Sequence, residues 1–199
     1  GSRLGSQYRR LRDRILSQLP RGGSAAILVA SADRDTGTTT TTIHLASVLA
    51  EVSSGDVLVI DADGRHGDLA RRLGIDAAYG LADVLAGRVG WQEAVVRIPP
   101  GCVQVLASCS KRVIAAPDLA TRLTAFVADL KRRYRAVIID GGIASSAEAT
   151  AWPAVCDGVY LCLELEETST RGTVEAVSQL RRAGGRVLGC IATRDGAAS

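Results

Sequence analysis

Short runs of apolar, mostly β-branched residues recur along the chain and are separated by longer amphipathic stretches. The apolar runs lie at residues 26–29, 57–60, 137–139, 159–163 and 187–191, with a weaker run at 103–106. They are continuous rather than alternating, which is typical of strands that are buried on both faces of a parallel sheet. The pattern therefore predicts a sheet that is covered on both sides.

Helical periodicity fills the segments between these runs. The predicted helices span residues 40–52, 69–73, 118–134, 147–155 and 170–183. Strands that alternate with helices predict right-handed βαβ units and a doubly wound α/β fold, with a mostly parallel sheet and helices on both faces. In such folds ligands bind at the carboxyl ends of the strands, so the residues that follow each strand carry the functional information.

The segment before the first strand predicts an amphipathic helix over residues 6–19, because Tyr8, Leu11, Ile15 and Leu19 recur at helical spacing. Arginines such as Arg9 and Arg12 occupy its other positions. One interpretation is a helix packed on the sheet with solvated arginines. The other is a docking helix, spanning residues 4–20, for a neighbouring subunit.

Composition narrows the class of protein. The chain has 199 residues, of which 47% are hydrophobic and 23% charged, so we expect one globular domain over residues 3–199. Met is absent and residues 1–2 resemble an expression scar, which we leave out of the fold. The net charge of +3 is too small to indicate nucleic-acid binding by itself. The 5 cysteines are scattered, which fits a reducing compartment.

The segment after the first strand, residues 31–40, stands where a phosphate-binding P-loop is expected: strand, Gly-containing turn, helix start. A P-loop needs a lysine that reaches the β/γ-phosphates and a hydroxyl that binds Mg²⁺. Gly37 and the Thr39 hydroxyl are in place, but Thr38 stands at the lysine position and Asp35 at a glycine position. The pattern is that of a damaged Walker A motif.

Carboxylates follow two further strands. Asp61 and Asp63 come directly after the run at 57–60, and Asp140 follows the run at 137–139 as in a Walker B motif. Such carboxylates can share the water shell of a Mg²⁺ ion or serve as a base. The alternative for Asp61 and Asp63 is a turn that caps the next helix. The expected Mg²⁺ ligands are Thr39, Asp61 and Asp140.

Taken together, these segments resemble the cytoplasmic domain of bacterial tyrosine kinases (BY kinases) of the exopolysaccharide chain-length or co-polymerase type, which belong to the ParA/MinD-like deviant P-loop NTPases. Residues 58–65 resemble the family's Walker A′ motif, residues 80–87 its G-L-S-D-x-L-x-G segment and residues 137–140 its Walker B. Residues 6–12 resemble its E-x-x-R-x-x-R contact helix.

The resemblance implies a set of site residues. Catalytic roles fall on Asp61, Asp63 and Asp140, and interface roles on Arg9 and Arg12. The nucleotide would be held by Asp35, Thr36, Gly37, Thr38, Thr39, Thr40 and Thr193. Thr193 replaces an Asn that helps to hold the adenine in the family, Ser6 replaces the contact-helix Glu, and the tail lacks the family's tyrosine cluster.

These departures favour a pseudokinase that acts as a scaffold or regulatory partner in exopolysaccharide assembly, with ATP binding and turnover weak or lost and no cofactor required. The alternative is an active tyrosine kinase or ATPase that uses Mg-ATP. A ParA-like ATPase on DNA or membrane has weaker support.

The expected partner is a protein of the export system, such as a membrane co-polymerase, and not nucleic acid. We expect a cytoplasmic location, tethered at the inner membrane face by a segment or partner outside this sequence, and a monomer or dimer rather than a closed ring, because Arg9 and Arg12 lack the Glu.

Overall fold

The structure is a computed structural model that describes residues 3–19, 23–34, 36–53, 55–63, 68–99, 101–108, 119–146, 150–165 and 167–194. The helices are α1 (Arg3–Gln18), α2 (Thr38–Ala50), α3 (Asp68–Leu73), α4 (Leu81–Leu85), α5 (Trp91–Ala94), α6 (Leu119–Arg133), the 3-10 turn η1 (Pro153–Val155) and α7 (Thr170–Arg182). The strands are β1 (Ala25–Ser31), β2 (Val57–Asp61), β3 (Val95–Ile98), β4 (Val103–Leu106), β5 (Ala136–Ile143), β6 (Gly158–Glu164) and β7 (Val187–Thr193).

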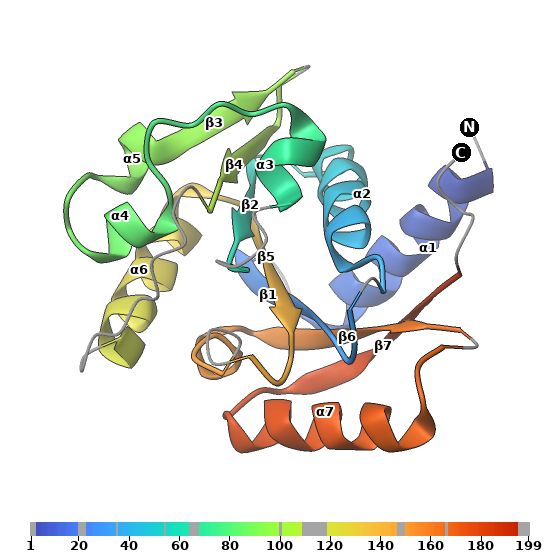
Figure 1. Ribbon diagram of the computed structural model, residues 1–199. Helices are drawn as coiled ribbons and strands as arrows, with labels where there is room; N and C mark the ends of the chain where they lie inside the picture. Colours follow the sequence, from blue (N-terminus) through green and yellow to red (C-terminus); the bar gives the residue numbers. More distant parts are fainter. Residues whose placement is uncertain are drawn as a thin grey trace.

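The strands form a 7-stranded sheet in the order β3-β4-β2-β5-β1-β6-β7 (Figure 1). All neighbouring pairs are parallel except β3 and β4, which pair antiparallel at one edge. The predicted mostly parallel, doubly wound sheet is therefore confirmed. It matches the architecture of P-loop NTPase folds.

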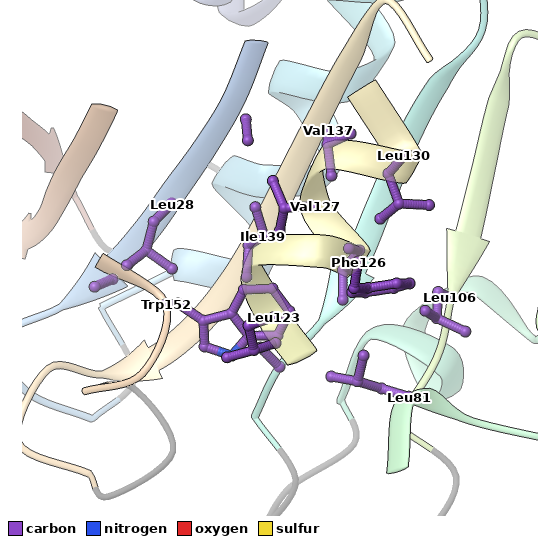
Figure 2. Packing of buried hydrophobic residues seen from close by; sticks show 14 of the residues in the cluster. Leu28, Leu81, Leu106, Leu123, Phe126, Val127, Leu130, Val137, Ile139 and Trp152 are labelled. Carbon is purple, nitrogen blue, oxygen red and sulfur yellow. The ribbon is translucent and has the colours of Figure 1, made fainter. Parts of the chain in front are cut away.

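Helices cover both faces of the sheet. Successive residues of β1 point to opposite sides, so Ala26 and Leu28 join one hydrophobic core and Ile27 and Val29 the other. The first core lies under α4, α6 and α7 and includes Trp152, and the second lies under α1, α2 and α3. Figure 2 shows part of the first core, in which the α6 side chains from Leu123 to Leu130 pack against Val137 and Ile139 of β5. Burial on both faces explains why the central strands read as continuous apolar runs.

The predicted helix over residues 147–155 is wrong where the structure describes it. Residues 150–152 form a turn and bend, and residues 153–155 are the 3-10 turn η1, while residues 147–149 lie outside the described residues. Pro153 has no backbone N–H, so a regular helix through this position would lose a hydrogen bond. Trp152 instead places its ring in the core, where the residue is only 3% exposed.

The sequence pattern did not predict the shortest elements. Helices α4 and α5 and the edge strand β3 were not predicted, because runs of 4 or 5 residues show no clear period. Strand β5 also continues past Asp140 through Gly141 and Gly142. Within the part of the chain that the structure describes, no helix combines the length and apolarity needed to cross a bilayer.

Candidate functional site

The loop between β1 and α2 lies at the carboxyl ends of the central strands. Strand β1 pairs with β5 on one side and β6 on the other, so the chain leaves β1 where the strand order reverses. This is the point at which open α/β sheets bind ligands. Asp35, one of the predicted loop residues, lies outside the described residues.

The start of α2 retains one part of an anion-binding cradle. Gly37 is the N-cap residue, with φ 74° and ψ 21°, and no side chain caps the helix there. Glycine adopts this left-handed conformation without strain. Its carbonyl accepts the first helical hydrogen bond, from Thr41 N at 2.8 Å. The first N–H groups of α2 therefore receive no cap from Gly37 and point toward the space where a phosphate would lie.

Thr38, at the lysine position, is turned into its own loop. The residue is 8% exposed, and its hydroxyl lies 3.0 Å from that of Thr36, which is also buried. A hydroxyl bonded inside the loop supplies no positive charge to a ligand. Thr38 therefore brings no charge to the start of α2.

Thr193, predicted near the adenine, reaches the loop from the opposite end of the sequence. Its Oγ1 lies 2.8 Å from the carbonyl oxygen of Thr36 and 3.0 Å from that of Leu163. The hydroxyl can donate to one of these carbonyls at a time. Thr193 thus ties the loop to β6 and β7, and its role toward an adenine remains a prediction.

Asp61 and Asp140 lie side by side. They are register partners on β2 and β5, and they are 1% and 2% exposed. Asp61 Oδ1 accepts a hydrogen bond from Asp63 N at 3.2 Å, whereas its Oδ2 is buried and has no partner among the described residues. The structure thus brings together the carboxylates that the sequence placed after separate strands.

Burial dominates the electrostatics of this pair. Loss of hydration, with smaller contributions from Asp140 and Asp63, raises the pKa of Asp61 to about 8. Burial raises the pKa of Asp140 to about 6, although a hydrogen bond from the Thr39 side chain lowers it in part. No described lysine approaches to offset these charges. The pair therefore holds its protons more tightly than exposed carboxyl groups do.

A Mg²⁺ ion fits the donors that are present. Thr39, Asp61 and Asp140 offer hard oxygen ligands, and the unpartnered Asp61 Oδ2 leaves one atom free to bind or orient a cation through water. Among the described residues no group of three or more His, Cys, Asp or Glu side chains could hold a metal alone. The ion would therefore depend on waters and phosphate oxygens for its remaining ligands, and it would neutralise charge on a bound phosphate.

Asp63 is held close to the backbone of β5. A Cβ atom added to Gly142, whose φ is 59°, would come within 2.9 Å of Asp63 Oδ2. The glycine pair after Asp140 thus leaves room for the Asp63 carboxylate to fold over the strand. Its catalytic role remains a prediction.

Arginines are the cations that the described part of the site contains. Arg72 of α3 donates from Nη1 to Thr40 Oγ1 at 3.2 Å, on the first turn of α2, and Arg34 is exposed in the loop itself. The sequence analysis did not identify Arg72 as a site residue, because no sequence pattern around Arg72 indicates that α3 contacts the start of α2. The one described lysine, Lys131, bonds Asp157 near the opposite edge of the sheet.

Arg9 and Arg12 have partners within their own chain, contrary to the expectation that they lose theirs. Arg9 makes a bidentate pair with Glu51, with both contacts at 2.8 Å. Arg12 is buried; it donates to the carbonyl oxygen of Val48 at 3.2 Å and contacts Asp13 at 2.8 Å. Glu51, directly after α2, thus pairs with Arg9 inside the chain. A role for Arg9 and Arg12 between subunits remains a prediction.

Comparison with known proteins finds sequence relatives but no matching family model. No protein-family model matches the chain. EpsB of Ralstonia solanacearum, provisionally named a tyrosine-protein kinase, is 27% identical over 185 residues, which are 92% of this chain and 24% of EpsB. The chain thus spans about a quarter of that relative's length.

Solved structures of similar fold include a bacterial tyrosine kinase domain and a MinD protein. The BceF tyrosine kinase domain superposes with a TM-score of 0.80 and 25% identity, over 94% of this chain and 76% of that one. The septum site-determining protein MinD of Pyrococcus horikoshii, complexed with Mg-ADP, gives a TM-score of 0.74 and 26% identity over 87% of this chain and 71% of MinD. The homologues and structural neighbours of this chain are therefore the cytoplasmic domains of bacterial tyrosine kinases, together with ParA/MinD-like P-loop NTPases.

Proposed function

We propose that this chain is a pseudokinase: a BY-kinase-like domain in which ATP binding and turnover are weak or lost, and which acts as a scaffold or regulatory partner in exopolysaccharide assembly. The observation that carries the proposal is Thr38, a buried threonine bonded to Thr36 where the fold calls for a lysine. The link to exopolysaccharide export, and to a membrane co-polymerase as partner, rests on the resemblance to the kinase family.

The expected loss of nucleotide affinity follows from the positive charge that Thr38 does not supply. A hydrogen bond to a charged group contributes about 1.5–3 kcal/mol, so loss of the lysine weakens nucleotide binding roughly ten- to a hundredfold. The transition state of phosphoryl transfer suffers more, because its stabilisation depends on positioning and charge neutralisation. Asp33 and Asp35 add negative charge to the same loop.

An active ATPase or kinase is the second candidate, and a specific observation favours it. Thr39, Asp61 and Asp140 keep a geometry compatible with Mg²⁺, and Arg72 lies against the first turn of α2. The relative MinD was solved with Mg-ADP. In this reading Arg72 or a neighbouring subunit supplies the charge that Thr38 lacks.

Calorimetry with Mg-ADP separates these candidates. We expect the wild-type chain to bind more weakly than about 100 μM, and Thr38→Lys to tighten binding at least tenfold, because it restores the phosphate-binding charge. Thr38→Val is the matched control: it removes the hydroxyl without adding charge, and it should leave the affinity near that of the wild type. Thermal melts confirm that each variant is folded.

The opposite result is equally definite. Micromolar affinity of the wild-type chain for Mg-ATP, together with ATP turnover that Asp61→Ala abolishes, would show an active enzyme.

The scaffold role has its own test in cells that lack the gene. Asp140→Asn should restore polymer length as well as the wild type does if the domain acts without chemistry, and should fail to restore it if turnover is required.

A further inference from the structure

Arginines without a partner gather at the edge of the sheet opposite the candidate site. They are Arg14 near the end of α1, Arg135 before β5, Arg181 and Arg182 in the last turn of α7, and Arg186 before β7. We call them the amino-edge arginines, because Arg135 and Arg186 directly precede β5 and β7, and the other three lie near the ends of the helices that lead into β1 and β7. All are exposed except Arg135, which is half-buried.

Backbone hydrogen bonds place two of these residues, Arg135 and Arg186, beside the starts of neighbouring strands. The carbonyl of Arg135 accepts from Ala25, the first residue of β1, and that of Arg186 accepts from Val159 at the start of β6. Strands β1 and β6 are neighbours in the sheet. Burial raises the pKa of Tyr160 to about 12, and the charges of Arg14 and Arg186 oppose that rise, so both side chains lie within electrostatic range of the same hydroxyl. Strands β5, β1, β6 and β7 are consecutive neighbours in the sheet (Figure 1).

The acidic side chains on this edge are already paired. Asp157 is bonded by Lys131, Asp56 by Arg97 and Arg133, and Glu51 by Arg9. The amino-edge arginines, in contrast, make no ion pair with any described residue. The helix dipole of α7 accounts for Arg181 and Arg182 at its carboxyl end, but not for Arg14, Arg135 and Arg186. A net positive charge thus remains on this edge of a chain whose total charge is only +3.

We infer that the amino-edge arginines form a docking surface for a membrane rich in anionic phospholipid. A plane of phosphate groups can contact all of them at once, since they come from separate elements along one edge, and guanidinium groups bind phosphate oxygens well. Tyr79 is the exposed aromatic side chain of the described residues, and it lies on the loop between α3 and α4. Among the described residues, this edge therefore offers no exposed aromatic side chain, the kind on which single-stranded nucleic acid prefers to stack. Docking here would leave the opposite edge, with Thr38 and Asp61, open to the cytoplasm, whether or not it binds a nucleotide.

Vesicle co-sedimentation tests the inference. The purified chain is mixed at low salt with vesicles of phosphatidylcholine alone or with about 30% phosphatidylglycerol. We expect binding to the anionic vesicles only, and weaker binding as salt rises. The triple variant Arg14→Gln, Arg182→Gln, Arg186→Gln should lose about a hundredfold in affinity, because each arginine near an anionic leaflet contributes roughly fivefold.

The matched control carries the same change in net charge on other surfaces. Arg71→Gln, Arg171→Gln and Arg194→Gln alter exposed arginines away from this edge, and this variant should bind within about twofold of the wild type. An equal loss in both variants would reduce the effect to net charge and overturn the inference. So would failure of the wild type to bind anionic vesicles, or tighter binding to a duplex DNA of 20 base pairs that the first triple variant abolishes. Melting curves of both variants establish that they are folded.

Discussion

Asp61 shows how burial beside a second carboxylate acts on a single residue. Its carboxyl group is 1% exposed beside Asp140, and one of its oxygens has no partner among the described residues. An ionised carboxylate in such a place is costly unless a cation or hydrogen bonds offset it. The same burial that makes Asp61 a candidate metal ligand is therefore a source of instability when no metal is bound.

The pKa shift of Asp61 gives a pH dependence of stability. Its folded-state pKa of about 8 lies above the value of an unfolded chain, so its protonated form favours folding. This contribution is complete below about pH 4 and is lost as pH rises toward 8; Asp140, with a pKa of about 6, acts in the lower part of that range. In EDTA we expect Asp61→Asn to raise the free energy of unfolding at pH 8 by about 2 kcal/mol and to change it little at pH 4.5.

Urea denaturation at both pH values measures this effect. Asp33→Asn, at an exposed position in the loop between β1 and α2, is the control and should change stability by less than about 0.5 kcal/mol. An Asp61→Asn variant that is no more stable than the wild type at pH 8 would show that Asp61 is not held in a raised-pKa environment.

Gly142 offers a second test at the scale of one residue. Alanine there meets both a left-handed φ of 59° and the Asp63 carboxylate at 2.9 Å. Gly74 has a similar φ of 63° but no atom within 4 Å of an added Cβ. We expect Gly142→Ala to lower the free energy of unfolding by about 1 kcal/mol more than Gly74→Ala does. Adding Asp63→Ala to Gly142→Ala should recover most of that difference, and equal losses at the two glycines would contradict the close packing of Asp63.

At the scale of elements, α1 is fixed to the body of the protein by its apolar face and its arginines. Ile15 is fully buried in the core that α2 and the sheet share, and Tyr8 stacks on His44 with ring centroids 4.8 Å apart. Arg9 and Arg12 add contacts to the end of α2. The exposed ion pair contributes little, so apolar burial supplies most of the attachment.

Truncation of α1 side chains tests this attachment. Ile15→Ala should lower the free energy of unfolding by about 3 kcal/mol, because it leaves a cavity against α2. Leu16→Ala, next along the same helix but 42% exposed, should cost less than about 1 kcal/mol. Urea denaturation followed by circular dichroism measures both. A separate early transition in the Ile15→Ala variant, with the main midpoint unchanged, would show that α1 docks independently of the rest of the fold.

At the scale of the whole molecule, the satisfied arginines of α1 bear on assembly. Because Glu51 pairs with Arg9 and Val48 accepts from Arg12, neither arginine depends on a neighbouring subunit. We expect light scattering after size exclusion to give a monomer or dimer at about 50 μM. A closed octamer that Arg9→Ala dissociates would refute this and would restore the contact-helix role implied by the family.

The sheet was predictable because its strands are buried on both faces. Continuous apolar runs at 26–29, 57–60 and 137–139 carry that signal in themselves, as does the placement of Asp61 and Asp140 after them. The edge strand β3 was missed, since its four residues are half-buried or exposed and follow no strict pattern. The predicted helix over 147–155 was wrong at residues 150–155, because its apolar spacing did not account for the break at Pro153.

What the sequence determined by itself was the order of the main elements, the edge at which the candidate site lies and the threonine at position 38, since each depends on residues close together in the chain. The tertiary structure alone decided the pairing of Thr193 with Thr36, of Arg9 with Glu51 and of Arg72 with Thr40. These contacts join residues 157, 42 and 32 positions apart, respectively. They follow from how sheet and helices pack, and no local pattern encodes them.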